Sequence, residues 1–552
     1  MSSAVQVVDL FSGPGGLAEG FAGYRDEQGN TPFEIALSVE SERSAYHTLL
    51  LRAFLRKFGE SYPSCYYAFL NDGGTEPNWA ERYPRQWDAA VRETLQLEIG
   101  TAAANIVVDA RIGAIRRHNG GGTVLLGGPP CQSYSVVGRA RNTGNASYDP
   151  ATDGRLFLYQ EYVRVMKVLR PAVAIMENVK GMLSVRAGGR AIIDDVVRSL
   201  QCAAGVDSYR LFTVAGPEAG LWEHDRPPSN FLVRTEELGI PQARHRVIVV
   251  CVRRDIDETV PVGELLRLHG AEQDVSVFDV IGLMPRLRSR LSRGDSESEW
   301  RDVVRDACEA IGSLPASWTD SELIPEELPR FQKAIARTQK RLRMASRLQW
   351  NGAVGGTEIS ESCPRELRTW ISDPTLRRLP NHETRGHMRG DIARYLFASA
   401  FADATGVSPK STNFPAVLAP NHANWLTGKF SDRFRVQLRD RPSTTVTSHI
   451  SKDGHYFIHP DPTQCRSLTV REAARLQTFP DNYLFRGGRT QQYVQVGNAV
   501  PPYFARQLAG RVCHVLGEYE RMRARSMAGS APRVSKERKP RSTEWPQDTV
   551  KA

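Results

Sequence analysis

The feature that most constrains the fold is an alternation of short apolar segments with helix-compatible stretches through the first 255 residues. Strands that alternate with helices form a parallel sheet covered on both faces, and its ligands bind beyond the carboxyl ends of the strands. The predicted fold class is therefore α/β. The expected strands lie at 4–11, 34–40, 123–126, 172–179 and 246–252, and the clearest helix lies at 156–169.

The same alternation predicts the domain organisation. Residues 51–104 interrupt it with aromatic and polar residues and are read as an insertion of unassigned role. After residue 255 arginine becomes dense and long apolar segments become rare, which predicts a second, smaller domain at 256–460. A predicted helix in 461–520 begins at a capping box, because Thr469 and Glu472 have the required spacing, and Pro480 stops it.

Charge is concentrated at the C-terminal end. The chain has 552 residues and a net charge of +10, and its last 32 residues hold nine Lys/Arg against three Asp/Glu. This basic tail, 521–552, is expected to be disordered, and the rest of the chain keeps a net charge of +4. The charge favours a polyanionic partner, although a solvated tail explains it equally well.

Targeting signals and metal sites are not expected. The N-terminal residues do not have the pattern of a signal peptide and no run of 18 apolar residues occurs, so a cytoplasmic protein without membrane contact is predicted. The eight cysteines are spread singly, which argues against a disulfide framework and a cysteine-built zinc site. His382 and His387 are expected to be hydrogen-bonded rather than metal ligands.

One cysteine has an unusual setting. Cys131, in GGPPCQSYS, follows an apolar strand and two prolines. Two prolines fix two φ angles and remove two N–H donors, so the backbone is stiff and the next side chain is held in one direction. A fixed direction suits a nucleophile. A small buried hydrophobic cysteine is the alternative.

A glycine turn follows the first strand. In DLFSGPGG the backbone can approach a ligand closely, and Glu40 ends the next strand, where its carboxylate could bind ribose hydroxyls. The pattern predicts a nucleoside-containing cofactor, with a plain structural turn as the alternative. It is neither G-x-G-x-x-G nor a P-loop.

These segments belong to an ordered series that resembles the motif set of the DNA (cytosine-5) methyltransferases of prokaryotic type. The series is DLFSGPGG, GGPPCQSYS, MENVKG, IPQARHRVIVV, LTVREAARLQTFPD and QVGNAVPP, and it covers roughly 1–255 and 460–515. The resemblance implies a Rossmann-like S-adenosylmethionine-dependent methyltransferase domain with a smaller target-recognition domain. It also implies that the substrate cytosine is flipped out of double-stranded DNA.

The resemblance assigns the catalytic residues. Cys131 is implied to attack carbon 6 of cytosine as a thiolate, which a positively polarised site would favour. Arg244 and Arg246, two apart at a strand start, are expected to face the same way and supply that charge. Glu177 is implied to protonate ring nitrogen 3, and burial is expected to raise its pKa. A solvated strand edge is the alternative for the arginines, and a surface or helix-cap acid for the glutamate.

The resemblance also implies a cofactor site closed by the helix that follows Asn498. Asp109, after NIVV, matches the family's adenine-binding acid only loosely because the insertion disturbs the spacing. The predicted cofactor-binding residues are Phe11, Gly13, Gly15, Gly16, Glu40, Asp109, Pro130, Asn498 and Val500.

The middle of the chain is expected to read the DNA sequence. Residues 330–347 hold seven Lys/Arg and no acid, with apolar residues at helical spacing, which indicates either a phosphate-contacting helix or a solvated amphipathic one. Candidate base-reading side chains are Arg385, Arg389, Asn421 and Asn424.

Two other functions stay open at this point. An RNA cytosine methyltransferase would carry the same motifs, and a non-catalytic DNA-binding module would be expected to have lost Cys131 or Glu177, which are both present. Amino-directed DNA methyltransferases are disfavoured because cysteine follows the prolines. The expected partners are double-stranded DNA and a cognate restriction or defence protein, and the expected state is a monomer.

Overall fold

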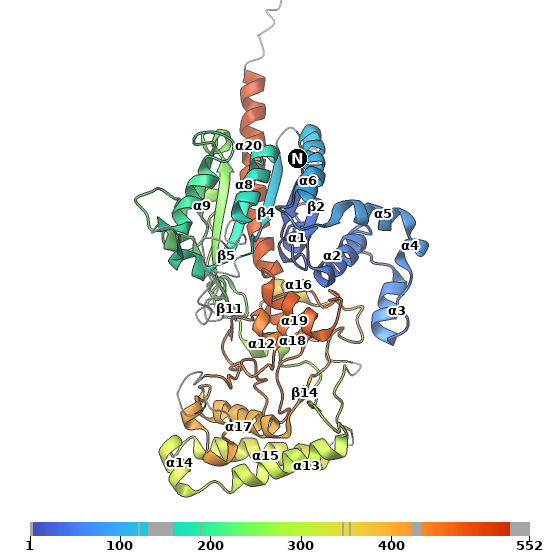
Figure 1. Ribbon diagram of the computed structural model, residues 1–552, viewed down its shortest axis with the longest axis vertical. Coiled ribbons are helices and arrows are strands. Elements are labelled where there is room, and N and C mark those ends of the chain that lie inside the picture. The colour runs from blue at the N-terminus through green and yellow to red at the C-terminus, as the bar shows by residue number, and fades with distance from the viewer. Residues whose placement is uncertain are drawn as a thin grey trace, which may run out of the picture.

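The structure is a computed structural model that describes residues 4–119, 122–130, 158–187, 190–344, 347–352, 355–421, 425 and 432–529. It is elongated, with a sheet-containing part at one end and a group of helices at the other (Figure 1). Cys131 and Asn424 lie outside the described residues. No helix among the described residues is long and apolar enough to cross a membrane.

A nine-stranded sheet forms the frame of the first part. Its strand order is β3-β2-β1-β4-β5-β12-β8-β9, with β10 paired to β12. The first five strands in this order are parallel, whereas β12 is antiparallel to both of its path neighbours. This confirms the predicted α/β class. The strands are β1 Val5–Leu10, β2 Phe33–Glu40, β3 Thr94–Gln96, β4 Thr123–Gly127, β5 Val173–Val179, β8 Tyr209–Thr213, β9 Gly220–Leu221, β10 Leu232–Arg234 and β12 His245–Arg253.

Helices cover both faces of the sheet, because alternate strand residues are apolar on each side. One face packs against α1 and α20 and against the short helices that follow β12, and the other against α6, α8 and α9. These helices are α1 Gly16–Ala22, α20 Pro502–Gly529, α10 Arg254–Asp257, α11 Val262–Leu265, α12 Val277–Ile281, α6 Ala102–Asn119, α8 Leu158–Leu169 and α9 Ile192–Gln201.

The segment interpreted as an insertion is partly built into this frame. It supplies β3, the edge strand that pairs with β2, so it does not simply interrupt the alternation. Its helices, together with α2, which begins before it, surround an aromatic cluster and project to one side of the sheet (Figure 1). They are α3 Ser64–Asp72, α4 Trp79–Arg82 and α5 Pro84–Glu93, and α2 is Arg43–Arg56.

The second part has a core of its own, at the far end of the molecule (Figure 1). Residues 256–284 do not belong to it, because their apolar side chains pack into the core beside the sheet. The predicted helix in 330–347 is present as α15. The helices of the distal core are α13 Glu297–Gly312, α14 Ala316–Glu322, α15 Leu328–Met344 and α17 Arg389–Thr405.

A hub of short elements joins the two cores. The predicted capping box is present: Thr469 accepts from the amide of Glu472 at the start of α18, and the glutamate accepts in return. The hub elements are α16 Arg365–Ile371, α18 Val470–Leu476, α19 Arg489–Asn498 and the two-residue pairs β11 Gln242–Ala243 with β15 Ser443–Thr444 and β13 Arg290–Leu291 with β14 Gly386–His387.

The remaining elements are small. They are β6 Arg186–Ala187, β7 Arg190–Ala191, and the 3₁₀ helices η3 Lys180–Ser184, η4 Pro228–Phe231, η5 Thr235–Leu238, η6 Ser411–Asn413, η7 Ala416–Leu418 and η8 Ser448–Ser451. The expectation of disorder from residue 521 is wrong for 521–529, which continue α20, and the rest of that tail lies outside the described residues.

Candidate active site

The glycine turn lies directly after β1 and has a constrained backbone. Phe11, Gly13 and Gly15 all have positive φ, at 55°, 56° and 95°. A phenylalanine in this region is strained, and such strain concentrates at functional sites. Among the described residues a Cβ at Gly13 would meet nothing within 4 Å, which leaves space beside this residue for a ligand.

Glu40 joins the turn to β2. Its Oε2 accepts from the Gly13 amide at 2.8 Å and its Oε1 from the Glu42 amide at 2.7 Å. Burial raises the pKa of Glu40, which these amide donors partly offset. A carboxylate fixed beside an open glycine backbone has free lone pairs for ribose hydroxyls, so the turn fits an adenosyl group.

A buried carboxyl lies beneath the turn. Asp9 is fully buried near the end of β1, and within the described part of the chain neither of its carboxylate oxygens has a hydrogen-bond partner. Burial raises the pKa of Asp9 to about 7, and the nearby Ser12 side chain and then Arg56 lower it in part. The motif therefore contains an acid that is costly to ionise directly under the candidate cofactor site.

The segment that follows Asn498 packs against this turn. Asn498 ends α19 and is exposed, and Val500 is buried against the start of α1. A Cβ at Gly16 would meet the Val500 carbonyl oxygen at 2.2 Å, so only glycine permits this approach. The predicted residues Phe11, Gly13, Gly15, Gly16, Glu40 and Val500 thus gather around one turn.

Glu177 lies beside the loop that leads to Cys131. A Cβ at Gly128 would meet Glu177 Oε2 at 3.0 Å, and Asn178 Nδ2 donates to the Pro129 carbonyl at 3.3 Å. Pro130, half-buried, is the last described residue before Cys131. The carboxyl end of β4 and that of β5 therefore bring the predicted acid to the start of the predicted nucleophile's loop.

Arg246 completes this group. Its Nε lies 2.8 Å from Glu177 Oε1, and both side chains are almost buried, at 13% and 12% exposure. The pairing follows from sheet register, because Ile248 of β12 lies opposite Glu177 and Arg246 is two residues away on the same face. A guanidinium and a carboxylate thus stand together at the sheet edge.

The prediction that Arg244 faces the same way as Arg246 is wrong. Arg244 is buried, lies between β11 and β12, and donates through Nη1 to the carbonyls of Val446 at 2.9 Å and Gly497 at 3.2 Å. The strand alternation on which the expectation rested does not extend back to this residue. Arg244 instead ties the hub and α19 to the sheet edge.

Asp109 is also misplaced by the sequence argument. NIVV is not a strand but part of α6, and Asp109 is paired there with Arg164 of α8. The acid that does follow the third strand is Glu98, two residues after Gln96, which lies opposite Glu40 in the parallel pair. Sequence reasoning missed it because β3 has only three residues and carries little apolar signal.

Three further residues singled out from the sequence, His382, His387 and Arg385, are buried. His382 is buried and its Nδ1 lies 3.0 Å from Thr469 Oγ1, and burial lowers its pKa to about 4. His387 is buried against Ser467 and Tyr395. Among the described residues, no group of three or more His, Cys, Asp or Glu could hold a metal ion. Arg385, a candidate base reader, is instead buried and donates to the carbonyls of Ile450 and Lys452.

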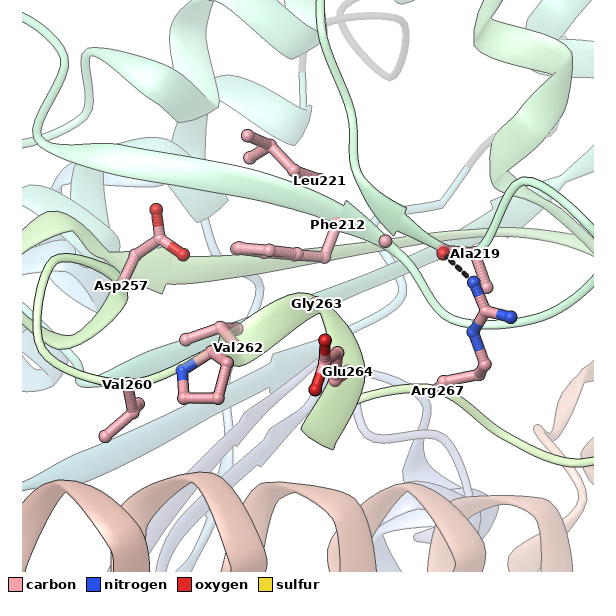
Figure 2. Close-up of a pocket in the computed structure, with 11 residues that line it drawn as sticks. Phe212, Ala219, Leu221, Asp257, Val260, Val262, Gly263, Glu264 and Arg267 are labelled. Atoms are coloured by element: carbon pink, nitrogen blue, oxygen red, sulfur yellow. Dashed lines mark hydrogen bonds between the residues drawn. The ribbon is translucent and has the colours of Figure 1, made fainter.

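A separate cavity of about 640 Å³ lies at β8, β9 and α11. Figure 2 shows Phe212 and Val262 on its walls and the Arg267 guanidinium donating to the Ala219 carbonyl, at 2.8 Å. None of the predicted catalytic or cofactor residues that the structure describes lines it. It is therefore distinct from the candidate active site.

Comparison with known proteins agrees with this geometry. The family described as C-5 cytosine-specific DNA methylase matches residues 82–514. The type II methyltransferase M.Bpa9945I of Bacillus paralicheniformis is 31% identical over 526 residues, covering 92% of this chain and 99% of that protein. The DNA (cytosine-5-)-methyltransferase M.ApeKI of Aeropyrum pernix is 24% identical over 431 residues, covering 71% and 81%. The chain belongs to the C-5 cytosine-specific DNA methylase family.

Proposed function

We propose that this enzyme transfers a methyl group from S-adenosylmethionine to carbon 5 of a cytosine flipped out of a specific double-stranded DNA sequence. The observation that carries the proposal is the grouping of Glu177, Arg246 and the Gly128–Pro130 loop at the sheet edge that also bears the glycine turn. S-adenosylmethionine bound over that turn supplies the methyl group. Phe11, Gly13 and Glu40 would hold it, and the Val500 backbone packs against Gly16 at the end of the turn.

The protein groups have distinct roles in this proposal. The Cys131 thiolate forms a bond to carbon 6, which moves an electron pair of the ring toward carbon 5 and ring nitrogen 3. Glu177 delivers a proton at nitrogen 3, and Arg246 orients that carboxyl and keeps positive charge at the site. Carbon 5 would then take the methyl group, with S-adenosylhomocysteine as the leaving group. Loss of the carbon 5 proton to water re-forms the carbon 5–carbon 6 double bond and expels the thiolate, and nitrogen 3 returns its proton to Glu177.

The distal part is proposed to bind and read the DNA. A basic cleft of about 390 Å³ lies between α15 and the 461–463 loop, lined by Arg286, Arg337, Lys340, Arg341, Met344, Asp461 and Thr463. Arg341 is fixed there, because its Nη1 donates to the Thr463 carbonyl at 2.6 Å. Because four cationic side chains and one carboxylate line this cleft, it favours binding of DNA phosphates. Phosphate contacts strengthen binding to every DNA sequence, so α15 is proposed to contribute to affinity and not to sequence recognition.

The setting is proposed from the relatives. Because M.Bpa9945I is called a type II methyltransferase, we place this chain in a restriction–modification system with a cognate nuclease, in the cytoplasm where the DNA is. We propose that it acts as a monomer.

The test combines site mapping with a nucleophile variant. Bisulfite sequencing of DNA from cells that express the wild type should reveal protected cytosines in one sequence context, and Cys131→Ser should abolish them because a hydroxyl is a far weaker nucleophile at neutral pH. DNA containing 5-fluorocytosine should trap the wild type covalently. Cys202→Ser, which alters an exposed cysteine, is the matched control and should keep full activity.

Two results would contradict the proposal. Turnover by the Cys131→Ser variant, or trapping at another cysteine, would remove Cys131 from its role. Protected cytosines in RNA but not in DNA would favour the RNA methyltransferase.

A further inference from the structure

One hydrogen bond connects the glycine turn to the segment between α18 and α19. The Tyr483 hydroxyl donates to the carbonyl oxygen of Pro14, and a Cβ at Gly15 would meet that hydroxyl at 3.2 Å. Two further tethers of the turn come from β2: the Ser12 amide donates to the Val39 carbonyl at 3.0 Å and the Gly13 amide to Glu40. Tyr483 thus holds the turn at Pro14, a residue that neither of these bonds reaches.

Tyr483 is itself rigidly placed. It is 1% exposed and its ring packs against Phe479 and Phe485, with centroids 4.9 and 5.4 Å away. Burial raises its pKa well above the usual value, so the hydroxyl keeps its proton and serves Pro14 as a donor.

Arg52 fixes the ring face and links it to α1. Its guanidinium lies 4.8 Å from the Tyr483 ring centroid, and its Nε donates to Glu19 Oε2 at 2.9 Å. Burial pushes the pKa of Glu19 up, but Arg52 and Arg56 outweigh it and hold the carboxyl ionised. A planar guanidinium that satisfies a carboxylate at its edge and an aromatic ring at its face has one stable orientation.

We propose that Tyr483, held by Arg52, is a positioning residue that fixes the glycine turn in its cofactor-binding conformation. Arg52 comes from the 51–104 segment, so this also gives that segment a role in cofactor binding. The inference rests on the proposed function only in taking the turn as the cofactor site.

Tyr483→Phe tests this with the smallest change, because it removes one hydroxyl and keeps the ring. Binding of S-adenosylhomocysteine, measured by calorimetry on the full chain, should weaken about tenfold, the scale of one buried hydrogen bond. The KM for S-adenosylmethionine should rise similarly, whereas kcat at saturating cofactor and the DNA affinity should stay within about twofold. Hydrogen exchange of peptides spanning 12–16 in the ligand-free protein should accelerate.

Tyr493→Phe is the matched control. Tyr493 is equally buried, and its hydroxyl donates to the Leu468 carbonyl at 2.6 Å. The Arg385 guanidinium lies 4.3 Å from the centroid of its ring, and no contact between Tyr493 and the turn occurs among these interactions. It should leave cofactor binding within twofold. Arg52→Lys keeps the charge beside Glu19 but loses the flat packing on the ring, and should weaken binding about threefold to tenfold.

The proposal is overturned if Tyr483→Phe binds the cofactor product normally, or if Tyr493→Phe weakens binding as much. Faster exchange at 12–16 without a loss of affinity also overturns it. Failure of the wild type to bind S-adenosylhomocysteine would instead reject the proposed function, and the exchange measurement on the ligand-free protein distinguishes the two.

Discussion

At the scale of single residues, the active site depends on a contact between two adjacent strands. Glu177 and Arg246 are 69 positions apart in the chain, yet antiparallel pairing of β5 with β12 makes them diagonal neighbours. Arg244, only two residues earlier, lies outside the strand and bonds to hub carbonyls. Two arginines two positions apart therefore have different contacts: Arg246 lies beside Glu177, and Arg244 donates to the carbonyls of Val446 and Gly497.

The residue-scale prediction concerns Glu177. Glu177→Ala should lower the single-turnover rate by about two to four orders of magnitude, the usual scale for loss of a positioned general acid, while cofactor affinity changes little. Glu218→Ala removes another glutamate near an arginine, Arg226 at 3.5 Å, but on the surface, and should leave the rate unchanged. Near-normal turnover of Glu177→Ala would show that this glutamate is structural.

At the scale of elements, the cofactor turn depends on how closely α20 approaches α1. Gly16 and Gly20 are one helical turn apart on the face of α1 that meets the chain entering α20. A Cβ at Gly20 would lie 2.4 Å from both the Pro502 carbonyl oxygen and the Ala505 side chain. Two helices at opposite ends of the sequence thus pack with their backbones nearly touching.

Gly16→Ala should therefore separate α1 from residue 500. We expect a loss of about 1–3 kcal/mol in the free energy of unfolding, typical of overpacking, and a large loss of cofactor affinity. Gly517→Ala is the control, since that helical glycine has open space around it, and it should be neutral or stabilise by about 0.5–1 kcal/mol. Denaturant titration and calorimetric binding check both; equal stability of Gly16→Ala and wild type would be incompatible with the packing described.

At the scale of the whole molecule, the core beside the sheet and the distal core of α13, α15 and α17 are separate. On the proposed function, the part around the sheet serves the steps common to every substrate, and the distal part binds and reads the DNA. Arg385 is removed from the set of base readers by its burial. Arg389, ion-paired with Glu299 near the surface, and the exposed Asn421 stay predictions.

The whole-molecule prediction separates specificity from affinity. Arg389→Ala or Asn421→Ala should relax the methylated sequence, because a good bidentate base contact is worth about 1–3 kcal/mol.

Joint replacement of the exposed cations Lys333, Lys340 and Arg343 on α15 should weaken binding to all sequences and reduce the salt slope by about 0.9 for each phosphate that the protein no longer neutralises. Methylation mapping and salt titrations measure both effects. If variants in 51–104 change the methylated DNA sequence and variants in the distal part never do, the distal part is not the segment that recognises the DNA sequence.

The sequence by itself determined five strands of the sheet, the glycine turn and the placement of Glu40 and Glu177 near strand ends, because these follow from local apolar patterns and from motifs that stay together in the chain. Only the tertiary structure decided which arginine meets Glu177, that Asp109 lies in a helix and that the Tyr483 hydroxyl donates to Pro14 in the glycine turn. Each of these depends on strand register or on contacts between segments far apart in sequence, which local periodicity does not encode. The edge strand β3 could not be predicted from the sequence for the same reason. Its three residues form a strand because they pair with β2, and their own pattern does not indicate one.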